Sequence, residues 1–150
     1  MKLAPRLQAA SLVLALALAP MGPALAASAA QEEANKNLVL AMWKGVIEDA
    51  DEAAVMRYIA PDYIQHNTRL EHGRAALLQG VRELKAGRAP HKPKTLVAAV
   101  AEGDFVTLVW TRQEADPTNP AHSILFNRFD MFRIKDGLVA EHWDDSAPAR

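Results

Sequence analysis

The chain has 150 residues, half of them hydrophobic, with 17 basic and 18 acidic residues and no cysteine. This length suits one domain. The balanced charge argues against a nucleic-acid partner, which needs a concentrated basic surface. The lack of cysteine excludes disulfides, thiolate metal sites and a cysteine nucleophile.

Residues 1–26 have the layout of a cleavable signal peptide. A short basic start with Lys2 and Arg6 precedes the uncharged apolar run Ser11–Ala19, which is too short for a bilayer span of roughly 20 residues. Proline and glycine follow, and then the small residues at 24–26. We expect cleavage after residue 26, with an uncleaved anchor as the alternative. The mature chain would be periplasmic or secreted, without further membrane contact.

The first half of the mature chain has a helical pattern, after a segment at 27–32 that we expect to be flexible. Within Gln31–Glu48, apolar residues recur every three to four positions and predict a helix with a broad apolar face. Asp51 is placed to cap a second short helix through Tyr58, and Pro61 prevents its continuation. A third helix is predicted over Arg74–Lys85 and stops at a glycine.

The second half is rich in β-branched and aromatic residues. After an extended segment at Tyr63–Asn67, it contains four predicted strands: Thr95–Ala101, Phe105–Arg112, Ser123–Ile134 and Leu138–Trp143. Helices followed by an antiparallel meander indicate an α+β domain, with helices packed on one face of a curved sheet. Such a sheet leaves a concave interior suited to a ligand.

The turn of the last hairpin decides whether a polar site exists. A three-residue loop, Lys135-Asp136-Gly137, places Asp130 opposite His142 and Arg128 opposite Asp144, with all four on one face. A two-residue loop at Asp136-Gly137 instead places Asp130 opposite Trp143. We favour the three-residue loop, because its type I turn followed by a bulge is common.

Grouped in this way, Asp130, His142 and Asp144 are candidates for acid/base chemistry. A carboxylate at the bottom of an apolar cavity holds its proton more tightly and can exchange it with a carbon acid near neutral pH. His142 would polarise an oxygen or relay the proton, and Arg128 would hold Asp144 ionised or bind a ligand carboxylate. The alternative is a cross-strand ion pair on a solvated face.

Further candidates for the pocket are polar and aromatic residues outside this hairpin. We expect His66 at the rim, with Tyr63, Phe132 and Trp110 lining the wall. A metal held by His66, His142 and Asp144 is possible chemistry. Since no HExxH or close His-x-His pattern occurs, we expect no metal.

Four stretches resemble a known family. They are APDYIQHN (60–67), GRAAL (73–77), AEGDFV (101–106) and FDMFRIKDGLVAEHWD (129–144). In this order they resemble the SnoaL-like polyketide cyclases of the nuclear transport factor 2-like superfamily, over roughly residues 33–146. The resemblance implies a cone-shaped α+β barrel, in which a curved antiparallel sheet wraps around N-terminal helices and encloses a deep apolar pocket. It also implies homodimers formed through the sheet.

The same resemblance implies a chemistry. The cyclases of this family catalyse intramolecular aldol condensation without a cofactor, and their acid/base aspartate corresponds to Asp144. Their assisting histidine corresponds to Asp130, where this chain differs. We therefore expect an exported protein that binds a small apolar carbonyl compound in a deep pocket and performs cofactor-free aldol-type cyclisation, isomerisation or related proton transfer. A non-catalytic periplasmic binding module is the alternative.

Overall fold

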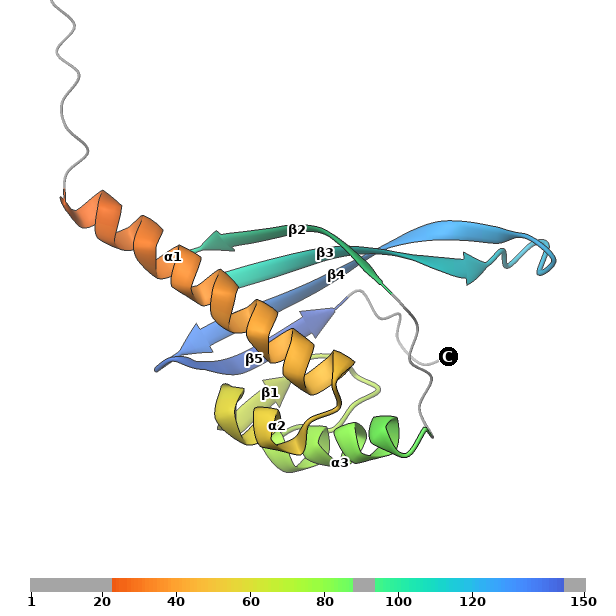
Figure 1. Cartoon of the computed structure of the whole chain (residues 1–150), viewed down its shortest axis with the longest axis horizontal. Coiled ribbons are helices and arrows are strands. Elements are labelled where there is room, and N and C mark those ends of the chain that lie inside the picture. Colours follow the sequence, from red (N-terminus) through yellow and green to blue (C-terminus); the bar gives the residue numbers. More distant parts are fainter. Residues whose placement is uncertain (1–22, 88–93, 145–150) are drawn as a thin grey trace, which may run out of the picture.

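The computed structural model describes residues 23–87 and 94–144 as one α+β unit (Figure 1). The elements in chain order are α1 (Pro23–Met42), the π-helix η1 (Trp43–Glu48), α2 (Glu52–Tyr58), β1 (Ile59–Gln65), α3 (Arg74–Lys85), β2 (Thr95–Glu102), β3 (Phe105–Ala115), β4 (Ser123–Lys135) and β5 (Leu138–Asp144).

Two predictions fall on the N-terminal part of the chain. The predicted signal peptide lies outside the described residues, except at its end, where α1 begins. The segment 27–32, expected to be flexible, is helical and belongs to α1. None of the described helices combines the length and the hydropathy needed to cross a membrane.

The first helix lies diagonally across the sheet (Figure 1). The apolar face predicted for it is buried. The helix continues into η1 at Trp43, which is buried together with Val39, Met42 and Val46. Helix η1 packs closely on α2 at Gly45. A Cβ atom added to Gly45 would lie only 2.7 Å from the Cβ atom of Ala54. A larger residue at position 45 would push the two helices apart.

The next elements follow the sequence signals closely. The Asp51 side chain accepts the backbone N–H of Ala53 at 2.9 Å, which caps α2 as predicted. The helix ends at Tyr58, three residues before Pro61, and the chain continues as β1. Helix α3 occupies the predicted bounds, and Gly87 takes a left-handed conformation with φ of 68° beyond its end.

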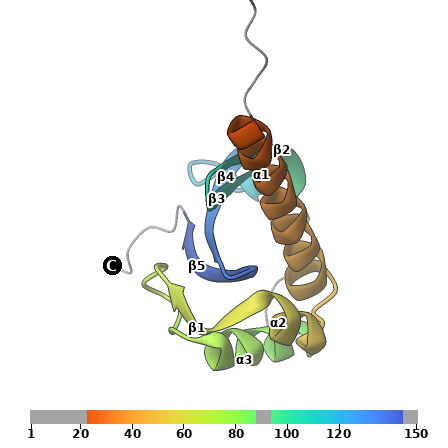
Figure 2. The ribbon, with the colours of Figure 1, turned by 90° about the vertical axis from the view of Figure 1, so that its left-hand side faces the viewer.

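The five strands form a curved, open sheet in the order β1-β5-β4-β3-β2. Figure 2 shows that the sheet bends around α1, with β1, α2 and α3 closing the lower end. The expected antiparallel arrangement holds for β2 to β5, but β1 pairs with β5 in parallel. The sheet is therefore mixed. Helix α3 and strands β2, β3 and β4 separate β1 from β5 in the chain, although the two strands lie side by side.

The predicted register of the last hairpin is wrong. Lys135 pairs with Leu138 across a two-residue turn, and both Asp136 (φ 52°) and Gly137 (φ 73°) are left-handed, as a type I′ turn requires. The register then shifts by one residue at Ala140, where β5 bulges. Beyond the bulge, Asp130 lies opposite Asp144, rather than opposite His142 as expected.

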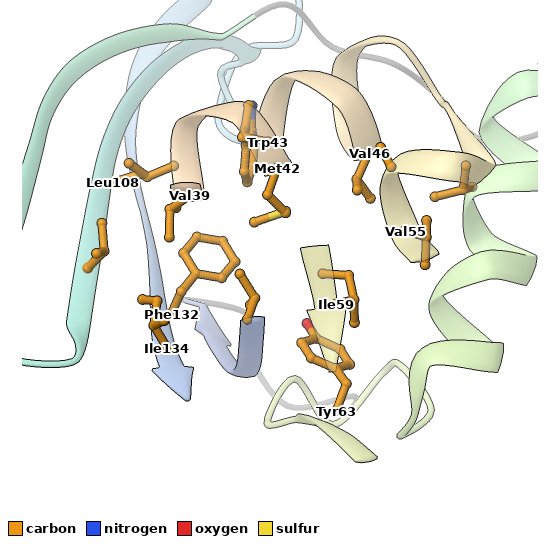
Figure 3. Packing of buried hydrophobic residues seen from close by; sticks show 14 of the residues in the cluster. Val39, Met42, Trp43, Val46, Val55, Ile59, Tyr63, Leu108, Phe132 and Ile134 are labelled. Carbon is orange, nitrogen blue, oxygen red and sulfur yellow. The ribbon is translucent and has the colours of Figure 1, made fainter. Parts of the chain in front are cut away.

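The hydrophobic core fills the space between the helices and the inner face of the sheet. Figure 3 shows Trp43 and Met42 above Phe132, with Ile59 and Tyr63 beside them. The fully enclosed side chains are aliphatic: Ile59, Leu108, Val39, Val46, Val55, Val81, Val106 and Val139. The buried polar residues Gln65, Asp130 and His142 lie on the three neighbouring strands β1, β4 and β5.

Candidate active site

The bulge at Ala140 places His142 and Asp144 on the inner face of the sheet with Asp130. Asp130 is 6 % exposed and His142 8 % exposed, and the rings of His142 and Phe132 stack with centroids 4.7 Å apart. His142 Nε2 lies 3.2 Å from Asp130 Oδ1. Asp130 and Asp144 are directly opposite each other on β4 and β5. The structure thus brings together the three residues that were predicted to be catalytic, by a different register.

The hydrogen-bond partners of His142 determine where its protons lie. Gln65 Oε1 accepts the backbone N–H of Asn67 at 3.0 Å, which fixes the orientation of the amide. The same oxygen lies 3.1 Å from His142 Nδ1, so Nδ1 carries a hydrogen and donates it. Nε2 lies 3.2 Å from Asp130 Oδ1, so the imidazole and the carboxyl group are placed to pass a proton between them.

Asp144 is half-buried at the end of β5 and lies within reach of this pair. Asn67 Nδ2 donates to Asp144 Oδ2 at 2.8 Å. Ligand atoms of Asp130, His142 and Asp144 all lie within 4.8 Å of one another, a spacing that also suits a metal ion. However, Asp130 already has a cationic partner, because Lys94 Nζ lies 3.6 Å from its Oδ2 atom. We therefore treat the three residues as a proton-transfer group.

Tyr63 brings a hydroxyl to the same region. It is 4 % exposed, and Gln65 Nε2 donates to its oxygen at 3.3 Å. Burial raises the pKa of Tyr63 well above its usual value of 10.0, and the negative charges of Asp144 and Asp130 raise this pKa further. The hydroxyl therefore stays protonated at neutral pH and can donate a hydrogen bond.

Three other predicted pocket residues lie on the inner face. Phe132 and Trp110 are buried in the core, where Trp110 stacks on Trp43 with centroids 4.7 Å apart. Arg128 is half-buried and lies opposite Trp110 in the β3–β4 pair. The prediction that Arg128 lies opposite Asp144 is wrong, because Asp130 occupies that position. Arg128 and Phe132 thus flank Asp130 along β4, and Trp110 lies on the neighbouring strand β3.

His66 lies on the other face of the sheet. Its Nε2 atom is 2.9 Å from Glu141 Oε2, and its ring stacks on Trp143 with centroids 4.3 Å apart. Side chains alternate along a strand, so Glu141 and Trp143 face away from His142 and Asp144. The structure does not bring His66 together with the predicted catalytic residues, and the set His66, His142 and Asp144 does not converge on one metal.

Three residues of the site were missed by the sequence analysis: Gln65, Asn67 and Lys94. Tyr63, Gln65 and Asn67 alternate along one extended segment, which is a signal that all three share a face. For Lys94 the signal is weaker, since it follows a proline-rich segment. Its side chain nevertheless reaches the Trp43 ring (4.5 Å) as well as Asp130.

The clearest pockets of the described part of the chain lie elsewhere. One of about 340 Å³ lies between the start of α1 and the two hairpin turns and includes Asn35 and Gly103. Another of about 380 Å³ lies on the outer face of the sheet and includes Val100, Phe105 and Met131. Neither includes a predicted site residue.

Comparison with known proteins identifies the family. The model of the SnoaL-like domain matches residues 39–142, which is more than half of the chain. The chain belongs to the SnoaL-like family. This match ends at His142, in the strand that carries two of the three clustered residues. Among curated proteins, none matches the chain significantly.

Solved structures similar to this SnoaL-like chain support its fold. A candidate polyketide cyclase from Acidithiobacillus ferrooxidans is 21 % identical, with a TM-score of 0.54 over 74 % of this chain and 86 % of that one. TerC, co-crystallised with polyporic acid, is 16 % identical, with a TM-score of 0.53 over 74 % and 89 %. An epoxide hydrolase of the LEH-like type from M. tuberculosis is 15 % identical, with a TM-score of 0.58 over 76 % and 83 %. At these identities, the similarity shows the fold alone.

Proposed function

We propose that this protein binds a small, largely apolar carbonyl compound against the inner face of its sheet and catalyses cofactor-free proton transfer. Aldol-type cyclisation and isomerisation are the reactions that this chemistry suits. The supporting observation is the buried Asp130–His142 pair, whose side chains are in hydrogen-bond contact and lie beside Asp144. Names of similar structures, a candidate polyketide cyclase and a protein crystallised with polyporic acid, agree with a small-molecule ligand.

The proposed roles follow from the positions of the groups. Asp144 takes the proton from the carbon next to the carbonyl. The Asp130–His142 pair and the Tyr63 hydroxyl supply hydrogen bonds to the oxyanion that forms. In a cyclisation, the enolate carbon then forms a carbon–carbon bond with a second carbonyl of the same substrate. In an isomerisation, a proton is instead returned to a different carbon. All of these proton donors and acceptors belong to the protein.

Two buried polar atoms on the inner face suit a ligand. Trp110 Nε1 has no hydrogen-bond partner within the described residues, and Asp130 Oδ2 has only the ion pair with Lys94 at 3.6 Å. A buried polar atom left without a hydrogen bond costs about 1–3 kcal/mol. A bound carbonyl or hydroxyl group between β3 and β4 would satisfy such atoms, and this adds to the case for a ligand here.

We also propose that the protein acts outside the cytoplasm. The support is the arrangement of the first 26 residues, a basic start, an apolar run and small residues before the expected cleavage position. Expression of the full chain in a bacterium, followed by cell fractionation and N-terminal sequencing, tests this. A mature protein that still begins at Met1 would contradict it.

The catalytic proposal is tested by hydrogen–deuterium exchange of a ketone, which requires only proton abstraction. Purified mature chain is incubated with cyclohexanone in deuterated buffer, and loss of the α-proton signals is followed by NMR. We expect exchange above the buffer rate, and a fall of at least about 100-fold in Asp144→Asn, the usual scale for loss of a general base. The control is Asp62→Asn, an exposed acid on β1.

The two outcomes separate catalysis from simple binding. Exchange that persists unchanged in Asp144→Asn would show that Asp144 is not the base. If the ketone shifts the NMR signals of Phe132 and Trp110 without any catalysed exchange, the protein is a binding module that uses the same inner face.

A further inference from the structure

Lys94 brings a half-buried amine next to the proton-transfer group, and the reaction proposed above gives it no role. It precedes β2, and its side chain is only 21 % exposed. The amine lies 4.5 Å from the ring centroid of Trp43, 5.9 Å from that of Trp110 and 3.6 Å from Asp130 Oδ2. Two indole rings and one carboxylate thus hold the amine at the inner face.

The environment of Lys94 differs from that of a surface lysine. Burial lowers the pKa of Lys94 from its usual 10.5, and the charges of Arg112 and Arg128 lower it further, while Asp130 opposes them. At Lys44, by contrast, the hydrogen bond to Asp49 raises the pKa of the exposed amine. At neutral pH, a larger share of Lys94 is therefore the neutral amine, which is the nucleophilic form.

We propose that Lys94 attacks the carbonyl carbon of the substrate and forms an imine with it. This inference rests on the proposed function, because it assumes a carbonyl ligand. The nitrogen of Lys94 forms a bond with the carbonyl carbon, and the oxygen leaves as water with the two protons of the amine. No oxidant or reductant is required. The product is a covalent intermediate with the carbon framework held between Trp43, Trp110 and Phe132.

The neighbouring groups suit the proton movements of this step. The Asp130 carboxylate, 3.6 Å from the amine, can take the proton that the nitrogen loses after attack. His142, bonded to the other oxygen of Asp130, can return a proton to the departing hydroxyl. A protonated imine withdraws electrons more strongly than the ketone does, so the adjacent carbon becomes easier for Asp144 to deprotonate.

An alternative role for Lys94 is that of a fixed positive charge that neutralises Asp130. That role needs a cation beside the carboxylate, whereas the imine needs a neutral, nucleophilic nitrogen. Lys94→Arg separates them, because arginine keeps the positive charge and its contact with aromatic rings and stays protonated. The matched control is Lys44→Arg, which makes the same change at an exposed position.

The test uses pentane-2,4-dione, a small 1,3-dicarbonyl compound. A neutral amine condenses with it, releasing one water, to a conjugated enaminone that absorbs in the near ultraviolet. The mature protein is incubated with the diketone at pH 7, absorbance is followed, and the modified lysine is located by peptide mass mapping. We expect one enaminone per chain at Lys94, formed at least about 10-fold faster than at any other lysine.

The variants give the deciding results. Lys94→Arg should lose the rapid phase while keeping the wild-type circular dichroism spectrum, and Lys44→Arg should retain that phase. Modification spread over the surface lysines, or a rapid phase that survives in Lys94→Arg, would overturn the imine proposal. Either result leaves the ketone exchange by Asp144 untouched, so failure here is distinct from failure of the proposed function.

Discussion

Gln65 organises the hydrogen bonds of the site, and replacing it with methionine tests that role. Methionine has a similar length and volume but cannot make the three hydrogen bonds of the amide. These are to the Tyr63 hydroxyl at 3.3 Å, to His142 Nδ1 at 3.1 Å and to the backbone N–H of Asn67 at 3.0 Å. Gln65 is only 5 % exposed, so water replaces few of these contacts.

The size of the effect follows from these contacts. A typical hydrogen bond contributes about 0.5–1.5 kcal/mol net, and a buried donor left unpaired costs about 1–3 kcal/mol. The His142 donor is buried and the Asn67 donor is partly buried, while methionine fills most of the vacated volume. We therefore expect Gln65→Met to lower the free energy of unfolding by about 2–4 kcal/mol.

The assay is urea denaturation at pH 7, with Gln79→Met as the control. Gln79 is exposed on α3 and donates to Glu83 at 3.3 Å on the helix surface, so its replacement should change stability by less than about 0.5 kcal/mol. In addition, the nitrogen chemical shifts of His142 should show a hydrogen on Nδ1 in the wild type. In Gln65→Met, where Nδ1 loses its partner, they should show a mixture of the two ring tautomers. Equal stability losses in the two variants would refute the reasoning.

Two further predictions concern the outer face of the sheet. The hydrogen bond from His66 is the largest cause of the lowered pKa of Glu141, so this carboxylate adds stability above about pH 4.5 and loses it as pH falls. His66→Ala should therefore make the acid loss of thermal stability shallower below about pH 4.5, whereas an unchanged profile would contradict this. Val100 is 59 % exposed beside Phe105, so Val100→Glu should convert the expected dimer into a monomer in analytical ultracentrifugation; a monomeric wild type would exclude that dimer.

Much of the fold could be predicted because its signals are local. The apolar period over Arg74–Lys85 and the glycine beyond it determine α3, and the Asp51 cap determines the start of α2. Strands β2 to β5 were located within about three residues at their ends, because β-branched and aromatic residues are bounded by turn residues. The parallel pairing of β1 with β5 had no comparable signal, since it joins segments far apart in the chain.

The parts of the site that were missed depend on that long-range pairing. Gln65 and Asn67 are ordinary polar residues in the sequence, and they reach His142 and Asp144 only because β1 lies beside β5. Lys94 reaches the site in the same way, through contacts of its side chain with Asp130 on β4 and Trp43 at the start of η1. Residue type and spacing along the chain do not indicate which distant residues come into contact. Asp144 was a candidate because the family resemblance aligns it with an acid/base aspartate.

The bulge at Ala140 explains why Asp130, His142 and Asp144 lie on one face although the predicted turn of the hairpin is wrong. With the two-residue turn and an uninterrupted ladder, Asp130 would face Trp143, and His142 and Asp144 would lie on the outer face. Hydrophobicity alone favours that arrangement, since burying an aromatic side chain contributes roughly 2–3 kcal/mol. The extra residue reverses it by placing His142 and Asp144 inside and leaving Trp143 outside to stack on His66. Bulges commonly redirect side chains next to active sites. A chain that gives up burial of a tryptophan to place an acid and a histidine inside its sheet therefore has a local structure suited to proton transfer.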